Sequence, residues 1–237
     1  MEDNIINFKE IKFYNYNFAK LFTIIDEGGY LVAPAASALT NIGKDKIYHE
    51  SLIQSDVAIL DSGFFCVLLR IFKGKKVSKF SGYLFLKNFL SLNFSKEIKF
   101  LSVDPNQEES KANKLLLNKN NIVNLKNYIA PQYIKEHIVD NNLLEEINRF
   151  QPRYIIINLG GGIQELLALY IKNNIKHKIS ILCTGAAIAF LTKKQAPIND
   201  IIDKLYLGWL ARIIFNPKKS LIRTVKSLYL IKQFIFD

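Results

Sequence analysis

Short runs of β-branched and aromatic residues alternate along the chain with longer stretches in which apolar positions recur at helical spacing. The strand-like runs fall at residues 30–32, 57–60, 98–103, 122–125, 154–159 and 179–183. Helical patterns lie between them, for example at residues 108–118, 131–149 and 163–174. Strands that alternate with helices predict a mostly parallel, Rossmann-like sheet with helices on both faces. The sequence therefore predicts an α/β fold, in which ligands bind at the carboxyl ends of the strands.

The α/β pattern gives way to a different kind of segment at the C-terminus. The chain has no internal repeat or low-complexity linker, and its 237 residues, 49% of them hydrophobic, suffice for a substantial core. We predict an α/β core over residues 1–196 and a basic, amphipathic helical appendage over residues 197–237. Between Asp203 and Asp237 there is no acidic residue, and the bases are Lys204, Arg212, Lys218, Lys219, Arg223, Lys226 and Lys232.

Hydropathy and charge limit where the protein works and what it binds. No apolar run reaches the roughly 18 to 20 uncharged residues of a membrane-spanning helix, and the first residues do not resemble a signal peptide. A cytoplasmic location is therefore expected. The formal net charge of +11 favours polyanionic partners, which include nucleic acid, anionic lipid headgroups and phosphorylated ligands. Cys66 and Cys183 lie far apart in apolar surroundings, so we expect buried thiols and no metal site.

A carboxylate follows one of the predicted strands. Asp61 comes directly after residues 57–60, and an apolar segment at residues 64–69 follows, which we interpret as a buried helix that begins near Ser62. Asp61 can cap this helix, because an Asp side chain accepts hydrogen bonds from the first free N–H groups. It can also serve as a catalytic carboxylate at a strand end, and the two roles are compatible in one residue.

A glycine-rich turn follows the predicted strand at residues 154–159. It contains three glycines, an isoleucine and two side chains with hydrogen-bonding groups: Gly160, Gly161, Gly162, Ile163, Gln164 and Glu165. Glycines permit close approach of a ligand, and the N–H groups at the start of a helix attract phosphate. The turn matches neither GxGxxG nor the P-loop, so a phosphate-binding loop and a plain tight turn both remain open. Thr184 and Gly185, at a third strand end, are also small enough to let a ligand pass.

The C-terminal tail interleaves apolar and basic residues. Between Pro217 and Phe236 its apolar residues are Leu221, Val225, Leu228, Tyr229, Ile231, Phe234 and Phe236. Together with the bases, this composition is typical of a helix that lies on an anionic membrane. An amphipathic helix that docks on the protein itself fits the same pattern.

The order of these segments resembles that of the bacterial WecG/TagA/CpsF-type glycosyltransferases, the N-acetylmannosaminyltransferase family of teichoic-acid, common-antigen and capsule synthesis. Residues 55–62, Ser-Asp-Val-Ala-Ile-Leu-Asp-Ser, are similar to the family's Ala-Asp-Leu-Val-Leu-Pro-Asp-Gly, and residues 160–165 stand where the family has Gly-x-Pro-Lys-Gln-Glu. The similarity covers nearly the whole chain. Further similar segments, in the same order, are residues 28–34, 79–85, 185–191, 196–197, 207–212, 217–219 and Arg223.

This resemblance implies an inverting transfer of an N-acetylmannosamine-like sugar from a UDP donor to an undecaprenyl-diphosphate-linked sugar, with no metal or other cofactor. Asp61 takes the place of the family's proposed general base. The implied donor site comprises Gly160, Gly161, Gly162, Gln164, Glu165 and Gly185. The implied site for the lipid diphosphate comprises Arg212, Lys218, Lys219 and Arg223. A peripheral position on an anionic membrane surface, at the inner face of the cell membrane, is implied as well.

Several positions depart from the family's pattern. Ala33 and Ala35 stand where Thr and Asn are usual, and Leu84 stands in place of an Asp. Gly162 and Ile163 stand in place of Pro and Lys, Gln195 in place of Arg, and Gly208 in place of Glu. Two alternatives follow: a different nucleotide-sugar donor, or a catalytically weak or inactive scaffold subunit of a polysaccharide-assembly complex. No nucleic-acid motif is present, so nucleic acid is not an expected partner; the oligomeric state stays open, with a homo-oligomer among the alternatives.

Overall fold

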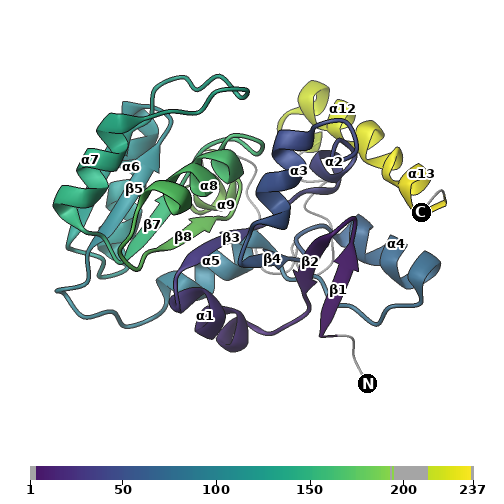
Figure 1. The fold of residues 1–237 in the computed structure, drawn as a ribbon, viewed down its shortest axis with the longest axis horizontal. Helices are drawn as coiled ribbons and strands as arrows, with labels where there is room; N and C mark the ends of the chain where they lie inside the picture. The colour runs from purple at the N-terminus through teal and green to yellow at the C-terminus, as the bar shows by residue number, and fades with distance from the viewer. Residues whose placement is uncertain (1–3, 193, 195–212, 236–237) are drawn as a thin grey trace.

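An eight-stranded sheet runs through the molecule. The computed structural model describes residues 4–192, 194 and 213–235. The strands are β1 (Ile5–Phe8), β2 (Ile11–Tyr14), β3 (Gly29–Val32), β4 (Val57–Ile59), β5 (Phe100–Asp104), β6 (Leu125–Ile129), β7 (Tyr154–Ile157) and β8 (Ser180–Cys183). They lie in the order β1-β2-β4-β3-β8-β7-β5-β6, and all neighbours are parallel except β1 and β2. The predicted α/β fold with a mostly parallel sheet is confirmed (Figure 1).

Helices cover both faces of this sheet, and each face has its own core. On one face lie α1 (Phe18–Asp26), α5 (Gly82–Leu90), α6 (Gln107–Lys119) and α9 (Ala187–Leu191). On the other lie α2 (Ala36–Leu39), α3 (Lys46–Ile53), α4 (Gly63–Lys73), α7 (Asn141–Phe150), α8 (Gln164–Asn174) and α13 (Leu230–Ile235). Side chains alternate along each strand, so in β3 Leu31 joins the first core whereas Tyr30 and Val32 join the second.

The N-terminal hairpin was not predicted from the hydropathy pattern. β1 and β2 are joined by Lys9 and Glu10, whose φ angles are both positive (49° and 65°). A two-residue turn of this conformation usually carries Asn or Gly, so the dipeptide Lys-Glu provides no turn signal. The hairpin adds an antiparallel pair to the edge of the sheet and buries Phe8 and Phe13 in the core.

Two predicted segments are wrong in their extent. The strand expected at residues 122–125 begins only at Leu125 and continues as β6. The helix expected at residues 131–149 is confined to α7, which begins at Asn141. Asp140 sets this start, because its carboxylate accepts hydrogen bonds from Leu143 N (2.9 Å) and from the hydroxyl groups of Tyr128 (2.9 Å) and Tyr133 (2.6 Å).

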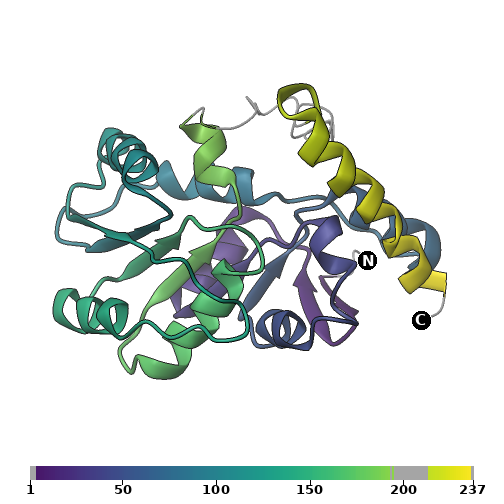
Figure 2. The ribbon, with the colours of Figure 1, turned by 90° about the horizontal axis from the view of Figure 1, so that it is seen from above.

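The two C-terminal helices, α12 (Pro217–Leu228) and α13, follow one another along one flank of the molecule (Figures 1 and 2). α13 buries Leu230 and Phe234 in the core, and the ring of Phe234 stacks on that of Phe8 at 4.7 Å between centroids. α12 packs against α2. The predicted boundary between residues 196 and 197 lies outside the described residues, so the division into core and appendage stays a prediction. Within the described ranges, no helix has both the length and the apolar character needed to cross a membrane.

Candidate active site

The carboxyl ends of the parallel strands form one edge of the sheet, and most of the predicted site residues lie there. Asp61 follows β4, Thr184 and Gly185 follow β8, and the glycine turn follows β7. After β7 the chain enters α8 on one face of the sheet, whereas after β8 it enters α9 on the other face. Strand ends at which the chain leaves toward opposite faces are the usual ligand-binding position of open α/β sheets.

Asp61 does not cap the helix that follows it. The cap of α4 is Ser62, whose hydroxyl oxygen accepts a hydrogen bond from Phe65 N at 3.2 Å. The half-buried Asp61 instead accepts, through Oδ1, a 2.8 Å hydrogen bond from the backbone N–H of Gly82, the first residue of α5. Negative charge is stabilised near a helix N-terminus. The predicted helix start near Ser62 is therefore confirmed, and the capping role considered for Asp61 is wrong.

Gly82 brings three strand ends together. A Cβ atom on Gly82 would lie 2.5 Å from the carbonyl oxygen of Thr184 and 3.1 Å from Cβ of Ala33. Glycine is thus required for α5 to begin this close to the ends of β8 and β3. Asp61, Ala33 and Thr184 consequently surround the first residue of α5.

Gln164 and Glu165 are each only 1% exposed, and they link the two glycine turns. Gln164 Oε1 accepts a hydrogen bond from Gly185 N at 3.3 Å, and Gln164 Nε2 donates to Glu165 Oε1 at 2.9 Å. Glu165 Oε2 accepts a 2.7 Å hydrogen bond from Gly162 N. Burial raises the pKa of the Glu165 carboxyl, although its hydrogen bonds to Gln164 and Gly162 act in the opposite direction. The structure thus brings these predicted donor-site residues together, with the two side chains bonded to the turns.

The glycine turn presents open surface. Gly160 and Gly161 are exposed, and a Cβ atom on any of Gly160, Gly161, Gly162 and Gly185 would have no heavy atom within 4 Å. Gly162 (φ 94°) and Gly185 (φ 68°) adopt the left-handed backbone conformation that favours glycine. The N–H group of Gly162, however, already donates to Glu165. An anion bound at this turn must therefore use other donors, or displace the Glu165 carboxylate.

A buried polar cluster at the end of β5 was not predicted from the sequence. Asp104 is fully buried, and its Oδ1 accepts hydrogen bonds from Ser102 Oγ (2.8 Å), Asn113 Nδ2 (2.7 Å) and Asn158 Nδ2 (2.9 Å). Its Oδ2 accepts one from Asn127 Nδ2 at 2.8 Å. The cluster ties β5, α6 and β6 to the residue that follows β7, and so fixes the strand that leads into the glycine turn. One sign of the cluster was present in the sequence, because Asp104 follows an apolar run as Asp61 does.

The residues predicted to bind a lipid diphosphate belong to the C-terminal segment. Lys218 and Arg223 are exposed on α12, whereas Arg212 and the side chain of Lys219 lie outside the described residues. α12 packs against α2, which begins at Ala36, directly after the altered positions Ala33 and Ala35 at the end of β3. α12 therefore lies next to the strand edge that carries Asp61.

A family model described as the glycosyl transferase WecG/TagA/CpsF family matches residues 6–236 of the chain. No curated protein sequence matches the chain significantly. The matched range includes Asp61, both glycine turns and both C-terminal helices. The chain therefore belongs to the WecG/TagA/CpsF family of glycosyltransferases.

Proposed function

We propose that the protein transfers an N-acetylhexosamine, by family default N-acetylmannosamine, from a UDP-sugar to an undecaprenyl-diphosphate-linked sugar, with inversion at the anomeric carbon. The observation that carries the proposal is the position of Asp61. Its carboxylate is held at the strand edge by Gly82 N, and Gly82 itself contacts Thr184, the residue before the turn that Gln164 binds. An oriented carboxylate thus lies on the same edge as a glycine-lined surface suited to a nucleotide sugar.

In the proposed reaction Asp61 is the general base. Its carboxylate takes the proton of the acceptor hydroxyl while that oxygen attacks the anomeric carbon of the donor sugar. The bond between the anomeric carbon and the β-phosphate oxygen of UDP breaks, and UDP leaves with the electron pair. A single displacement of this kind inverts the configuration at the anomeric carbon. The negative charge that develops on UDP needs donors nearby, and the exposed turn of Gly160 and Gly161 is the proposed place for them.

The proposed donor site keeps its shape through Gln164, Glu165 and Gly185. Gln164 and Glu165 bond to Gly185 and Gly162, so they hold the two turns at a fixed separation. The glycines leave room for the donor, because a side chain at Gly160 or Gly161 would project into open space. Loss of the Gln164 amide should therefore weaken donor binding by releasing the Gly185 turn.

The outward face of α12 favours the proposal that the acceptor is bound to a membrane. The less exposed residues of this helix are polar, Ser220, Thr224 and Ser227, whereas its exposed residues include Leu221 (49%), Ile222 (70%), Val225 (56%) and Leu228 (52%). A helix on a soluble protein usually turns its apolar side toward the core. The reversed polarity suits a helix that dips into a bilayer, with Lys218 and Arg223 near anionic headgroups or a lipid diphosphate. We therefore propose that the protein lies peripherally on a membrane, on the inner face as the family resemblance implies.

The decisive experiment supplies purified protein with a diphospholipid-linked sugar and a panel of UDP-N-acetylhexosamines, and measures release of UDP. We expect release with at least one donor, and NMR of the product should show the inverted anomer. Release must disappear without the acceptor lipid, which serves as the control. Binding of the acceptor lipid without UDP release from any donor would favour the scaffold alternative, which the lost polar groups at Ala33, Ala35 and Leu84 motivate.

A further inference from the structure

We propose that α4 and the loop after it form a second membrane-contacting element, which binds an anionic lipid bilayer together with α12. This inference rests on the proposed function, because it extends the surface that faces the lipid-linked acceptor. It depends, however, on side chains of residues 67–76, which lie far from the C-terminal segment in the chain.

α4 is apolar around most of its circumference. Its inward side chains, Phe65, Cys66, Leu68 and Leu69, are buried in the core. Its outward side is apolar as well, since Val67, Ile71 and Phe72 are 40%, 70% and 42% exposed. The outer face of a helix on a soluble protein is usually polar. The 11 residues of α4 are too few to span a bilayer, but a helix of this kind can lie in the interface.

The charge around α4 identifies the partner as an anionic surface. No acidic residue occurs between Asp61 and Glu97, whereas the bases in this stretch are Arg70, Lys73, Lys75, Lys76, Lys79, Lys87 and Lys96. Arg70, Lys73 and Lys76 are exposed beside the apolar side chains of α4. Bases next to an apolar surface attract anionic headgroups while the apolar side chains enter the acyl boundary. A bilayer that contains anionic lipid supplies both kinds of contact at once.

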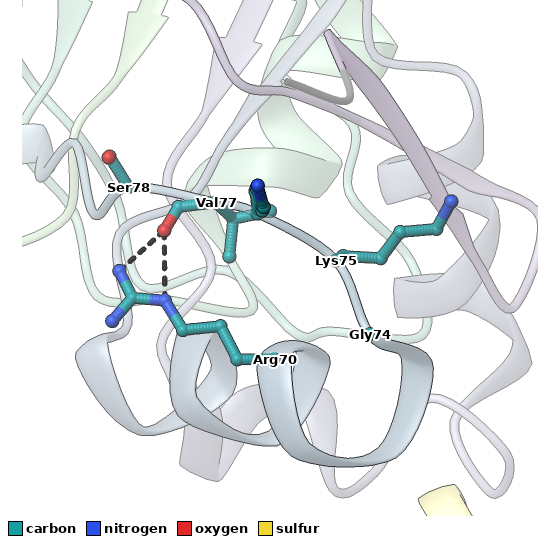
Figure 3. A pocket seen from close by; sticks show the side chains of 6 residues that line it. Arg70, Gly74, Lys75, Val77 and Ser78 are labelled. Atoms are coloured by element: carbon teal, nitrogen blue, oxygen red, sulfur yellow. Dashed lines mark hydrogen bonds between the residues drawn. The ribbon is translucent and has the colours of Figure 1, made fainter. Parts of the chain in front are cut away.

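Arg70 holds the basic loop against the end of α4. The helix ends at Lys73, and the cap residue after it, Gly74, has a left-handed conformation (φ 61°). Arg70 then donates hydrogen bonds from Nε (3.0 Å) and Nη2 (2.5 Å) to the carbonyl oxygen of Val77. Figure 3 shows the loop folded back in this way, with Lys75 directed away from Arg70 around a shallow hollow of about 320 Å³. The loop that carries Lys75 and Lys76 is therefore held against the C-terminal end of α4.

α4 lies beside the C-terminal helices and next to the candidate general base. The ring of Phe72 is 5.9 Å from that of Phe234 in α13, and both overall views show the two helices side by side (Figures 1 and 2). α4 also begins two residues after Asp61. Contact of α4 with the bilayer therefore brings Asp61 to the membrane surface, where the sugar of a lipid-linked acceptor is presented.

The first test compares two apolar side chains of equal exposure in the full-length chain. Ile71 in α4 is 70% exposed, and Leu115 in α6, on the other face of the sheet, is 72% exposed. Binding is measured by co-sedimentation with vesicles of phosphatidylcholine and phosphatidylglycerol. Ile71→Asp should lower the partition coefficient roughly tenfold, because an apolar contact is lost, whereas Leu115→Asp should change it by less than about twofold. Thermal unfolding confirms that each variant is folded.

The second test reverses charge. Lys75→Glu combined with Lys76→Glu should lower binding to the vesicles with phosphatidylglycerol, but not the weaker binding to phosphatidylcholine alone. The matched control is Lys111→Glu combined with Lys114→Glu, which changes the net charge equally on α6. An equal loss in both pairs would overturn the assignment, because the effect would then come from net charge alone.

Ile222→Asp in α12 separates this inference from the proposed function. If Ile222→Asp lowers partition and Ile71→Asp does not, α4 is not a contact element and the inference is wrong, while the proposed function stands. If neither variant changes partition, the membrane-bound acceptor site is itself contradicted. If Ile71→Asp instead dissociates a dimer in sedimentation velocity, the face of α4 is an interface between two copies, and the inference is again wrong.

Discussion

The carboxylate of Asp61 accepts a 2.8 Å hydrogen bond from the backbone N–H of Gly82, and this bond joins the end of β4 to the first residue of α5. Because its carboxylate is bonded to Gly82, Asp61 does not cap α4, and Ser62 performs that role. The bond to Gly82 also orients the carboxylate at the strand edge. Asp61 and Gly82 therefore act as a pair: Gly82 can approach only because it lacks a side chain, and Asp61 is held by that approach.

Replacement of Asp61 by asparagine should abolish most of the transfer activity while leaving the fold intact. Asn can still accept the hydrogen bond from Gly82 N through its amide oxygen, but it cannot take a proton from the acceptor hydroxyl. We expect kcat of the Asp61→Asn variant to fall by roughly 10² or more, with an unchanged melting temperature. UDP release at saturating donor measures the rate. A variant that retains about half of the wild-type rate would rule out Asp61 as the general base.

Gly82→Ala should lower both stability and activity. The added Cβ would lie 2.5 Å from the Thr184 carbonyl oxygen, so α5 or the Thr184 turn must shift. We expect a loss of about 1–3 kcal/mol in the free energy of unfolding, measured by urea denaturation, and a lower kcat because Asp61 moves with Gly82. Gly43→Ala is the control, since a Cβ at Gly43 meets no heavy atom within 4 Å. Equal stability of the two variants would contradict the close packing at Gly82.

The candidate site at the edge of the sheet could be predicted because its polar residues and glycines directly follow short apolar runs. Asp61 and the turn that holds Gln164 drew attention by their place after a strand, whereas the roles expected of these two residues came from the resemblance to the family. The contacts themselves could not be predicted, because Gly82 meets Thr184 and Asp61 only through the packing of α5 on the sheet. The same limit applies to α12: its pattern predicts an amphipathic helix, but only its packing against α2 shows that the apolar side is turned outward.

The Asp104 cluster should be essential for stability. Asp104→Ala would remove the acceptor of four hydrogen bonds. The buried Asn113 Nδ2 would lose its bond to Asp104, and Asn158 Nδ2 would keep only its 2.9 Å bond to Ser102 Oγ. We expect the free energy of unfolding to fall by about 3 kcal/mol or more. Glu108→Ala serves as the control, because Glu108 forms an ion pair with Lys194 at the surface, where solvent and salt screen the attraction and the pair contributes little to stability. A loss for Asp104→Ala no larger than that of the control would contradict this role.

Phe234 should anchor the C-terminal segment to the core. Its ring stacks on Phe8 at 4.7 Å and lies 5.9 Å from Phe65, so Phe234→Ala leaves a cavity between β1 and α4. We expect a loss of about 3–5 kcal/mol in the free energy of unfolding. The neighbouring Ile235, which is 57% exposed, provides the control, and Ile235→Ala should cost less than about 1 kcal/mol. Deletion of residues 217–237 is therefore a poor test of membrane binding, since it also removes this anchor.

Glu165 should make the protein less stable as the pH rises from about 4.5 toward neutrality. Burial raises the pKa of its carboxyl in the folded state, so above pH 4.5 the unfolded chain releases this proton first. Because the unfolded state then binds fewer protons, the free energy of unfolding decreases with pH through this window. Glu165→Gln cannot titrate, and it should gain melting temperature relative to the wild type as the pH increases from 4 to 7.

The comparison between the two proteins at each pH removes the contributions of all other titrating groups. The Glu165→Gln amide has one acceptor oxygen where the carboxylate has two, so either Gln164 Nε2 or Gly162 N loses its acceptor. This loss lowers the stability of the variant by the same amount throughout, so only the change of the difference with pH is diagnostic. For Glu108→Gln the difference in melting temperature from the wild type should change with pH in the opposite direction. The hydrogen bond from Lys194 lowers the pKa of Glu108 in the folded state, so its removal costs most stability above the unfolded pKa and less as the pH falls through the folded pKa. If the difference in melting temperature between Glu165→Gln and the wild type does not change with pH, the Glu165 carboxyl has the same pKa in the folded and unfolded states. Its burial between Gly162 and Gln164 would then not oppose ionisation.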